Sequence, residues 1–164
     1  MAHNAEEKSF ERIALKMTSS LDLHEVLISI TQGLVDELDA ALARIWLIGP
    51  GDLCSDCHKV DSCTNRQSCL HLIVSAGIHT RTNGEMRRVP LGALKIGGIA
   101  QGAGSLSTND VMNDERVYNK KWLKENELRS FAGHPLIFGG ETLGVLSMFS
   151  RRVMEQEEFS RIAL

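Results

Sequence analysis

Four cysteines lie close together in the first half of the chain. Cys54, Cys57, Cys63 and Cys69 follow a C-x2-C-x5-C-x5-C pattern between two predicted strands. Thiolates this close in sequence can meet around one zinc ion or one iron–sulfur cluster. The first pair has the spacing of a zinc knuckle, whereas the second pair is further apart than the usual two to four residues. The pattern therefore predicts a metal site without deciding between zinc and an iron–sulfur cluster.

Other uses of the cysteines stay open at this level. The sequence shows no export signal, so we expect a cytoplasmic protein whose thiols stay reduced unless metal or redox chemistry uses them. Disulfides or free redox thiols are the second possibility. Cys54-x-x-Cys57-His58 also matches the attachment motif of haem c, but that attachment needs export to an oxidising side. His58 and His71 flank the cysteines and could replace a thiolate, although a solvated loop histidine is the simpler interpretation.

No other pattern in the sequence indicates chemistry. The chain has no G-x-S-x-G nucleophile motif, no H-E-x-x-H and no carboxylate pair in a recognisable pocket motif. Gly97, Gly98, Gly102 and Gly104 lack the order and the preceding strand of a phosphate-binding loop. We therefore expect no catalytic residues and no enzymatic activity.

Length and composition indicate one soluble domain. The chain has 164 residues, of which 43% are apolar and 24% charged, and a domain of that size can bury its own core. The net charge is −3, and basic residues gather only in pairs, so nucleic-acid binding is not expected. No apolar run reaches the ~18 residues of a membrane span, so no membrane insertion is expected.

The segment Arg129–Ser150 predicts a central β-hairpin. Two apolar runs, Phe131–Phe138 and Thr142–Phe149, flank Gly139-Gly140-Glu141, which is typical of two strands joined by a tight turn. The second run shows no alternation of apolar and polar residues. Both of its faces are therefore expected to be covered, with helices packed on the sheet.

The remaining elements are predicted from periodicity and turn residues. Apolar residues from Leu23 to Leu38 repeat with the period of an amphipathic helix. Further strands are predicted at 41–48, 70–76, 88–91 and 105–109, a glycine-spaced helix at 93–101 and a short helix within 113–126. The cysteine-rich loop spans 49–69.

Both ends of the chain carry short amphipathic patterns. Residues 6–17 predict a helix, and residues 155–164 predict the start of another. Phe159-Ser-Arg-Ile-Ala-Leu164 is similar to Phe10-Glu-Arg-Ile-Ala-Leu15. One domain has no obvious place to bury both helices, so a homodimer formed through them is expected.

Several ordered segments resemble a GAF domain of the kind found in bacterial sensor histidine kinases and related signalling regulators. The resemblance depends on Asn109-Asp110-Val111, on Ser130-Phe-Ala-Gly133-His-Pro135-Leu136 and on Gly144-Val-Leu146. It implies an α+β fold of the GAF/PAS type, with a central antiparallel sheet of five or six strands and helices on both faces. It also implies three parts: an N-terminal helix (1–18), the GAF domain (19–154) and a C-terminal signalling helix that starts at 155.

The resemblance further implies a regulatory sensor role. A small-molecule, metal or redox signal would reach an output domain of histidine kinase or transcriptional regulator type through the terminal helices. The alternative is a structural dimerisation module with a metal-stapled loop and no ligand. A ligand pocket would lie on the sheet face under the glycine-spaced helix, and its candidate residues are Ile96, Ile99, Val111, Tyr118, Trp122 and His134.

Overall fold

A six-stranded antiparallel sheet forms the centre of the protein. The computed structural model describes residues 21–163, so the predicted N-terminal helix lies outside the described residues. The strand order is β3-β2-β1-β6-β5-β4, and every neighbouring pair is antiparallel. The strands are β1 (Ala40–Pro50), β2 (Ser68–Gly77), β3 (Arg88–Pro90), β4 (Leu106–Thr108), β5 (Ser130–Phe138) and β6 (Glu141–Ser150).

The predicted hairpin is formed by β5 and β6. Gly139 and Gly140 join the strands with φ angles of 57° and 82°, and such left-handed backbone favours glycine at both positions. Strand β6 pairs with β1 on one side and β5 on the other, and it is buried continuously from Gly144 to Ser150. The prediction that both faces of this strand are covered is therefore confirmed.

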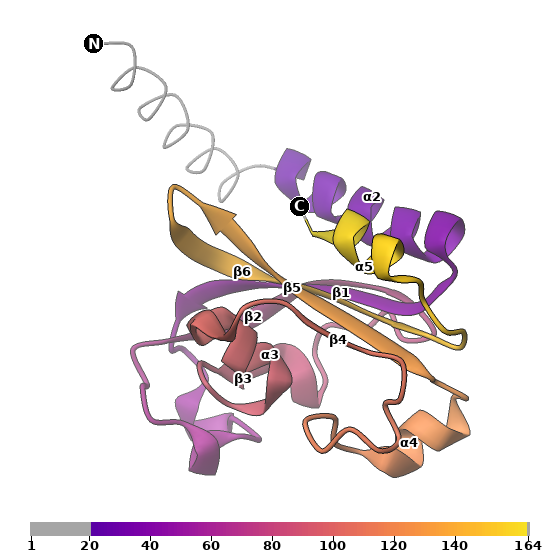
Figure 1. Ribbon diagram of the computed structural model, residues 1–164. Coiled ribbons are helices and arrows are strands. Elements are labelled where there is room, and N and C mark those ends of the chain that lie inside the picture. Colours follow the sequence, from indigo (N-terminus) through magenta and orange to yellow (C-terminus); the bar gives the residue numbers. More distant parts are fainter. Residues whose placement is uncertain (1–20, 164) are drawn as a thin grey trace.

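Helices cover both faces of the sheet (Figure 1). Helices α2 (Leu21–Leu38) and α5 (Gln156–Ile162) pack on one face. Helices α3 (Leu94–Gly98) and α4 (Lys120–Glu125) lie on the other, and Ile99–Ala103 extends α3 by a single π-helical turn. The predicted α+β fold with an antiparallel sheet and helices on both faces is confirmed.

Two apolar layers hold the helices to the sheet. The layer under α2 and α5 includes Leu27, Ile45, Val74, Met148 and Phe159. The layer on the opposite face includes Leu42, Trp46, Leu70, Ile96 and Phe131. Alternate residues of the central strands thus point into different layers, which is the expected consequence of the pleat.

The cysteine-rich loop leaves the sheet where β1 passes to β2. It contains two short 3-10 turns, Cys54–Asp56 and Val60–Ser62. The backbone N–H of Gly51 donates to the carbonyl of Gln67 at 3.0 Å, which closes the base of the loop. A Cβ atom at Gly51 would lie 1.9 Å from the carbonyl oxygen of Arg66, so only glycine fits this close approach.

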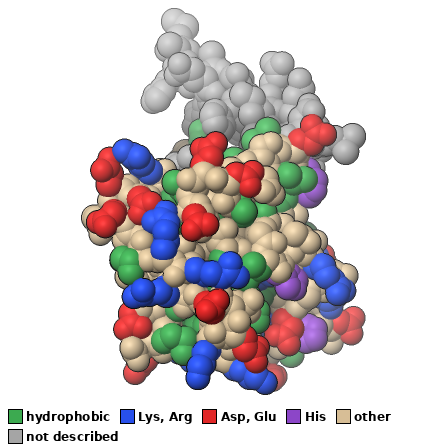
Figure 2. Space-filling view, turned by 90° about the vertical axis from the view of Figure 1, so that its right-hand side faces the viewer, with side chains coloured by type: hydrophobic (Ala, Val, Ile, Leu, Met, Phe, Trp, Pro, Cys, Tyr) green, Lys and Arg blue, Asp and Glu red, His purple; other side chains and the backbone are tan. Residues whose placement is uncertain are grey.

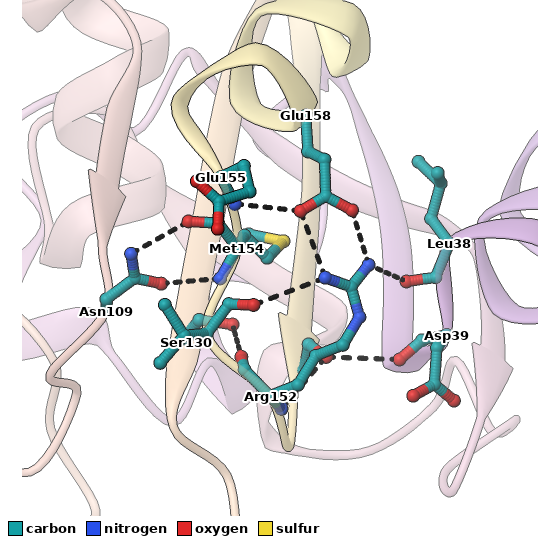
Figure 3. Close-up of polar contacts among 10 residues, drawn as sticks. Leu38, Asp39, Asn109, Ser130, Arg152, Met154, Glu155 and Glu158 are labelled. Carbon is teal, nitrogen blue, oxygen red and sulfur yellow. Dashed lines mark hydrogen bonds and ion pairs between the residues drawn. The ribbon is translucent and has the colours of Figure 1, made fainter.

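Polar contacts join the end of β6 to both helices of the α2/α5 face (Figure 3). The Arg152 guanidinium donates to the carboxylate of Glu158 in α5 and, at 3.0 Å, to the carbonyl of Leu38 at the end of α2. The side-chain amide of Asn109 forms two hydrogen bonds of 2.9 Å with the backbone of Met154. Asn109 therefore fixes the link that leads into α5.

The described surface gives two further observations. On the face shown in Figure 2, acidic and basic side chains are interspersed instead of forming a patch of one sign. Among the helices within residues 21–163, none has both the length and the apolar character needed to cross a membrane.

Candidate functional site

All four cysteines line one small cavity at the end of the sheet. Cys54 and Cys57 come from the first 3-10 turn and its end, Cys63 follows the second turn, and Cys69 is the second residue of β2. The cavity has a volume of about 20 Å³. A space of roughly 10–15 Å³ already holds one water molecule, so the cavity has room for one small ion. Within residues 21–163, however, no three of the four Sγ atoms lie within 4.8 Å of one another, so binding of one ion by all four sulfurs would draw the loop closer together.

The thiols are free, and their present contacts are weak. Cys69 is buried and the other three are half-buried. The Sγ atoms of Cys54 and Cys63 lie 3.8 Å and 3.3 Å from the carbonyl oxygens of Arg66 and Asn65. A neutral thiol is a weak donor, so a cation entering the cavity would displace little.

Positive charge lies beside the four sulfurs. Arg66 and Arg88 line the cavity, and Arg88 forms two hydrogen bonds of 2.8 Å with the carboxylate of Asp52. Burial raises the pKa of the Cys69 thiol, and the charge of Arg88 partly opposes that shift. Since metal ligands must be thiolates, binding of a cation here would release protons.

A second group of donor atoms lies next to the cysteines. Within residues 21–163, ligand atoms of Asp52, Cys69 and His71 lie within 4.8 Å of one another. Both oxygens of Asp52 already accept from Arg88, and Nε2 of His71 lies 2.7 Å from the carbonyl oxygen of Pro50. A metal ion bound by this group would therefore compete with the contacts that Asp52 makes with Arg88 and His71 makes with Pro50. His58, the other flanking histidine, is not among the residues that line the cysteine cavity.

A larger cavity of about 260 Å³ opens on the α3/α4 face of the sheet. Tyr118 and Trp122, two of the predicted pocket residues, line it. Ile96, Ile99 and Val111 are fully buried in the apolar layer on the same face. Ile96 and Val111 serve as core, whereas Ile99 also lines, with Tyr118, another cavity of about 410 Å³ beside α3.

His134 lies away from that cavity. It alternates with Phe131 along β5, so its side chain points to the α2/α5 face, opposite the cavity. Its Nδ1 lies 2.8 Å from Oγ of Ser105, and its buried Nε2 has no hydrogen-bond partner. Burial lowers the pKa of His134. The structure thus does not bring His134 to the other pocket candidates.

Most of the residues that line the larger cavity were not predicted from the sequence, and among them are two partly buried cations, Arg44 and Lys95. Arg44 projects from the middle of β1, and Lys95 projects from α3. Arg44 interrupts the apolar run that predicts the first strand, and this interruption was the available signal. Lys95 gave no comparable signal, because a lysine in a short helix is ordinary.

Burial lowers the pKa of both residues. The pKa of Arg44 falls to about 10, and the pKa of Lys95 falls to about 8. Arg44 donates from Nε to Oγ of Ser75 at 3.0 Å, and its NH2 lies 3.1 Å from Nδ1 of His79. None of the ion pairs within residues 21–163 includes Arg44 or Lys95.

Comparison with known proteins gives one family and many solved structures of similar fold. Residues 22–164 match the family model of the GAF domain. The comparison with curated proteins gives no match.

Three solved structures illustrate the similarity of fold. The GAF domain of a phosphoenolpyruvate-protein phosphotransferase from Coxiella burnetii has a TM-score of 0.62 and 19% identity, over 93% of this chain and 83% of that one. The type II free methionine-R-sulfoxide reductase from Thermoplasma acidophilum has a TM-score of 0.62 and 13% identity, over 85% and 82%. The nlh2 GAF domain of A. aeolicus has a TM-score of 0.60 and 17% identity, over 92% and 82%.

Proposed function

The chain belongs to the GAF domain family, and we propose that it is a regulatory sensor domain whose four cysteines hold one metal ion. The observation that carries the metal proposal is the convergence of all four cysteine residues on a single cavity of about 20 Å³. Four thiolates suit zinc, which prefers tetrahedral sulfur ligands in structural sites. A volume near that of one water molecule favours one ion over a multi-atom cluster.

The proposed ion would hold the loop in place. Residues 51–67 form a long connection with only two short turns, and ordering such a segment costs conformational entropy. Arg66 would offset part of the negative charge of four thiolates, whereas the charge of Arg88 is already paired with Asp52. The apolar core lies elsewhere and does not stabilise this loop. The free energy of metal binding would therefore stabilise its ordered form.

A path from the loop to α2 supports the sensory role. Helix α2 ends one residue before β1 begins and packs along β1 and β2. Its first turns therefore lie toward the end of β1 from which the loop departs (Figure 1). A change in the loop would reach α2 through the paired strands, and α2 would transmit it to a neighbouring output domain of histidine kinase or transcriptional regulator type.

The partner proposed for the domain itself is a second copy of this chain. Val26 and Ile28 are 51% and 46% exposed on α2, although both are apolar. The two side chains project about 200° apart around the helix, so a homodimer through one side of α2 would cover Val26 and leave Ile28 and its i+4 neighbour Gln32 outside the interface. Light scattering should show a dimer in the wild type and a monomer for Val26→Lys, whereas Gln32→Lys, an exposed control on the same helix, should stay dimeric.

Catalysis is not part of the proposal. A free methionine-R-sulfoxide reductase shares the fold, so the fold by itself is compatible with an enzyme. No cysteine lines the larger cavity, however, and the four cysteines lie together at another place. This separation favours a metal-binding loop over a cysteine-dependent reaction in the larger cavity.

Metal analysis of protein purified without air, combined with an absorption spectrum, tests the metal proposal. We expect about one zinc per chain, no visible absorption, and loss of the metal in Cys57→Ser and Cys63→Ser. His58→Ala is the matched control, because His58 does not line the cavity. If the protein instead contains iron and sulfide and absorbs visible light, the site holds a redox cluster and not a structural zinc ion. If it contains no metal, the cysteines act as redox thiols.

A further inference from the structure

Arg44 is a charged residue on a strand whose other residues facing the same side are apolar, and its partners on the two neighbouring strands are Ser75 and Ser147. It lies on β1 between Leu42 and Trp46, which point to the same face and are 1% and 2% exposed. A guanidinium placed among such neighbours loses much of its hydration. Residues that break the local pattern in this way are commonly retained for function.

A second cation faces the same cavity. Lys95 enters the cavity from α3, and its charge is close enough to Arg44 for the two to repel each other. The Nζ atom of Lys95 lies 4.6 Å and 5.0 Å from the ring centroids of Phe131 and Phe149. The rings hold the ammonium group near the cavity but do not neutralise it.

Acidic groups near the cavity do not neutralise this pair. Glu85 lines the cavity and is exposed, but neither cation lies within ion-pair distance of it. Asp114 is the acid whose charge acts on Lys95, yet its carboxylate is held by Arg116, with Nε of Arg116 2.8 Å from Oδ1. The cavity therefore carries excess positive charge in a chain whose net charge is −3.

The rest of the cavity wall is largely apolar. Leu42 and Leu72 form part of the sheet side, and Trp122 and Phe149 contribute aromatic surfaces. The rings of Trp122 and Phe149 meet edge to face, with centroids 5.9 Å apart. Flat walls of this kind suit a planar or compact apolar group.

We propose that this cavity binds a small organic anion, with its carboxylate or phosphate group between Arg44 and Lys95 and its apolar body against Leu72 and Trp122. The inference rests on the sensory role proposed above, to which it adds a ligand class. It does not depend on the metal ion, because the four cysteines line a different cavity.

Matched pairs of acids and amides test this inference on the full chain. The probes are phenylacetate, indole-3-acetate and 2-naphthoate, each beside its neutral amide, with phenyl phosphate and inorganic phosphate to separate the two anionic groups. Binding is measured by the fluorescence of Trp122, which lines the cavity, and by calorimetry. Trp122→Phe identifies which part of the signal comes from Trp122 and which from Trp46.

At least one organic acid or phenyl phosphate should bind, and its neutral counterpart should bind at least tenfold more weakly. Arg44→Met and Lys95→Met should each weaken the bound anion at least tenfold, because one charged contact of this kind is worth about that much. Lys121→Met is the control, since Lys121 is exposed on α4 and outside the cavity. Circular dichroism of each variant shows whether it is folded.

Three results would overturn the inference: no anion of the panel binds, an amide binds as tightly as its acid, or folded Arg44→Met and Lys95→Met variants bind like wild type. Metal content is measured on the same preparation. Anion binding without metal contradicts only the proposal for the cysteines, and metal without anion binding contradicts only the proposal for this cavity.

Discussion

Arg152 and Glu158 form a two-point ion pair across the link between β6 and α5. The guanidinium NH2 lies 2.6 Å from Oε1 of Glu158, and NH1 lies 3.0 Å from Oε2. The same NH2 donates to the carbonyl of Leu38 at 3.0 Å, so one arginine joins the end of α2 to the start of α5 (Figure 3). The geometry is specific because both ends of the guanidinium are used.

Replacing Arg152 by methionine should therefore release α5 from the sheet. Hydrogen exchange of the α5 amides is expected to become about tenfold faster, while the amides of β6 stay protected. Arg161→Met is the control, because Arg161 is exposed and forms its ion pair with Glu157 within α5. Equal exchange in Arg152→Met and wild type would show that the apolar contacts of Phe159 suffice.

The affinity of the larger cavity for an anion should fall as the pH rises through about 8. Burial lowers the pKa of Lys95 to about 8, and only the protonated form attracts an anion. Because the anion binds the protonated form of Lys95, the affinity is highest below this pH and declines above it.

The other titratable groups that line the cavity should not produce this midpoint. Arg44 stays charged to a higher pH than Lys95, and burial raises the pKa of Tyr118 further from neutrality. His79, Arg81 and Glu85 also line the cavity, so the profile is compared with that of Lys95→Met. A midpoint near 8 that persists in Lys95→Met would assign the titration to another group.

The base of the cysteine loop should depend on Gly51. A Cβ at this position would lie 1.9 Å from the carbonyl oxygen of Arg66, so Gly51→Ala must move the two loop strands apart. We expect at least tenfold weaker zinc binding, measured by competition with a chelator. Gly84→Ala is the control, because nothing lies within 4 Å of its added Cβ. Unchanged zinc affinity in Gly51→Ala would show that the cysteines form their site without the closed loop base.

The cysteine loop should support the larger cavity through residues 84–87. Nζ of Lys59 in the cysteine loop donates to the carbonyl of Glu85 at 2.7 Å, and Nε1 of Trp46 donates to that of Met86 at 3.0 Å. Glu85 and Met86 line the cavity. Lys59→Met should thus weaken anion binding about threefold, the effect of losing one solvent-exposed hydrogen bond, while one equivalent of zinc stays bound. Identical calorimetry for Lys59→Met and wild type would contradict the coupling.

A side chain at Gly133 should lower the stability of the fold. A Cβ there would lie 2.6 Å from Cδ1 of Ile99, and Gly133→Ala should lower the free energy of unfolding by about 1–3 kcal/mol. Gly98→Ala should raise it by roughly 0.5–1 kcal/mol, because that position is helical and open. Urea unfolding measures both. A Gly133→Ala variant as stable as wild type would show that Ile99 moves aside at no cost.

The strand and helix pattern could be predicted from the sequence because it depends on local signals. The glycine pair at 139–140 requires left-handed backbone, and the absence of alternation in β6 reflects burial on both faces. The periodic apolar residues of α2 likewise mark the side that packs on the sheet. Such features act over a few residues and do not need knowledge of distant contacts.

The location of the four cysteines in one loop was also visible in the sequence, but the loop could span about 50 Å if extended, and its closure depends on the pairing of β1 with β2. The sequence did not show the volume of their cavity, or that Arg88 and Asp52 support it from β3 and the loop base. Those contacts join residues 36 positions apart, and only strand pairing sets their distance.

The residues that line the larger cavity could be identified only from the tertiary structure. Trp122 was a candidate from the resemblance, but Arg44 and Lys95 come from different elements and meet only because the sheet and α3 face each other. His134 was also a candidate, but it lies on the opposite face of β5 from the cavity, because successive residues of a strand point to opposite faces of the sheet. The sequence specifies which residues are apolar or charged, whereas the face and the neighbours of each side chain depend on the packing of the whole domain.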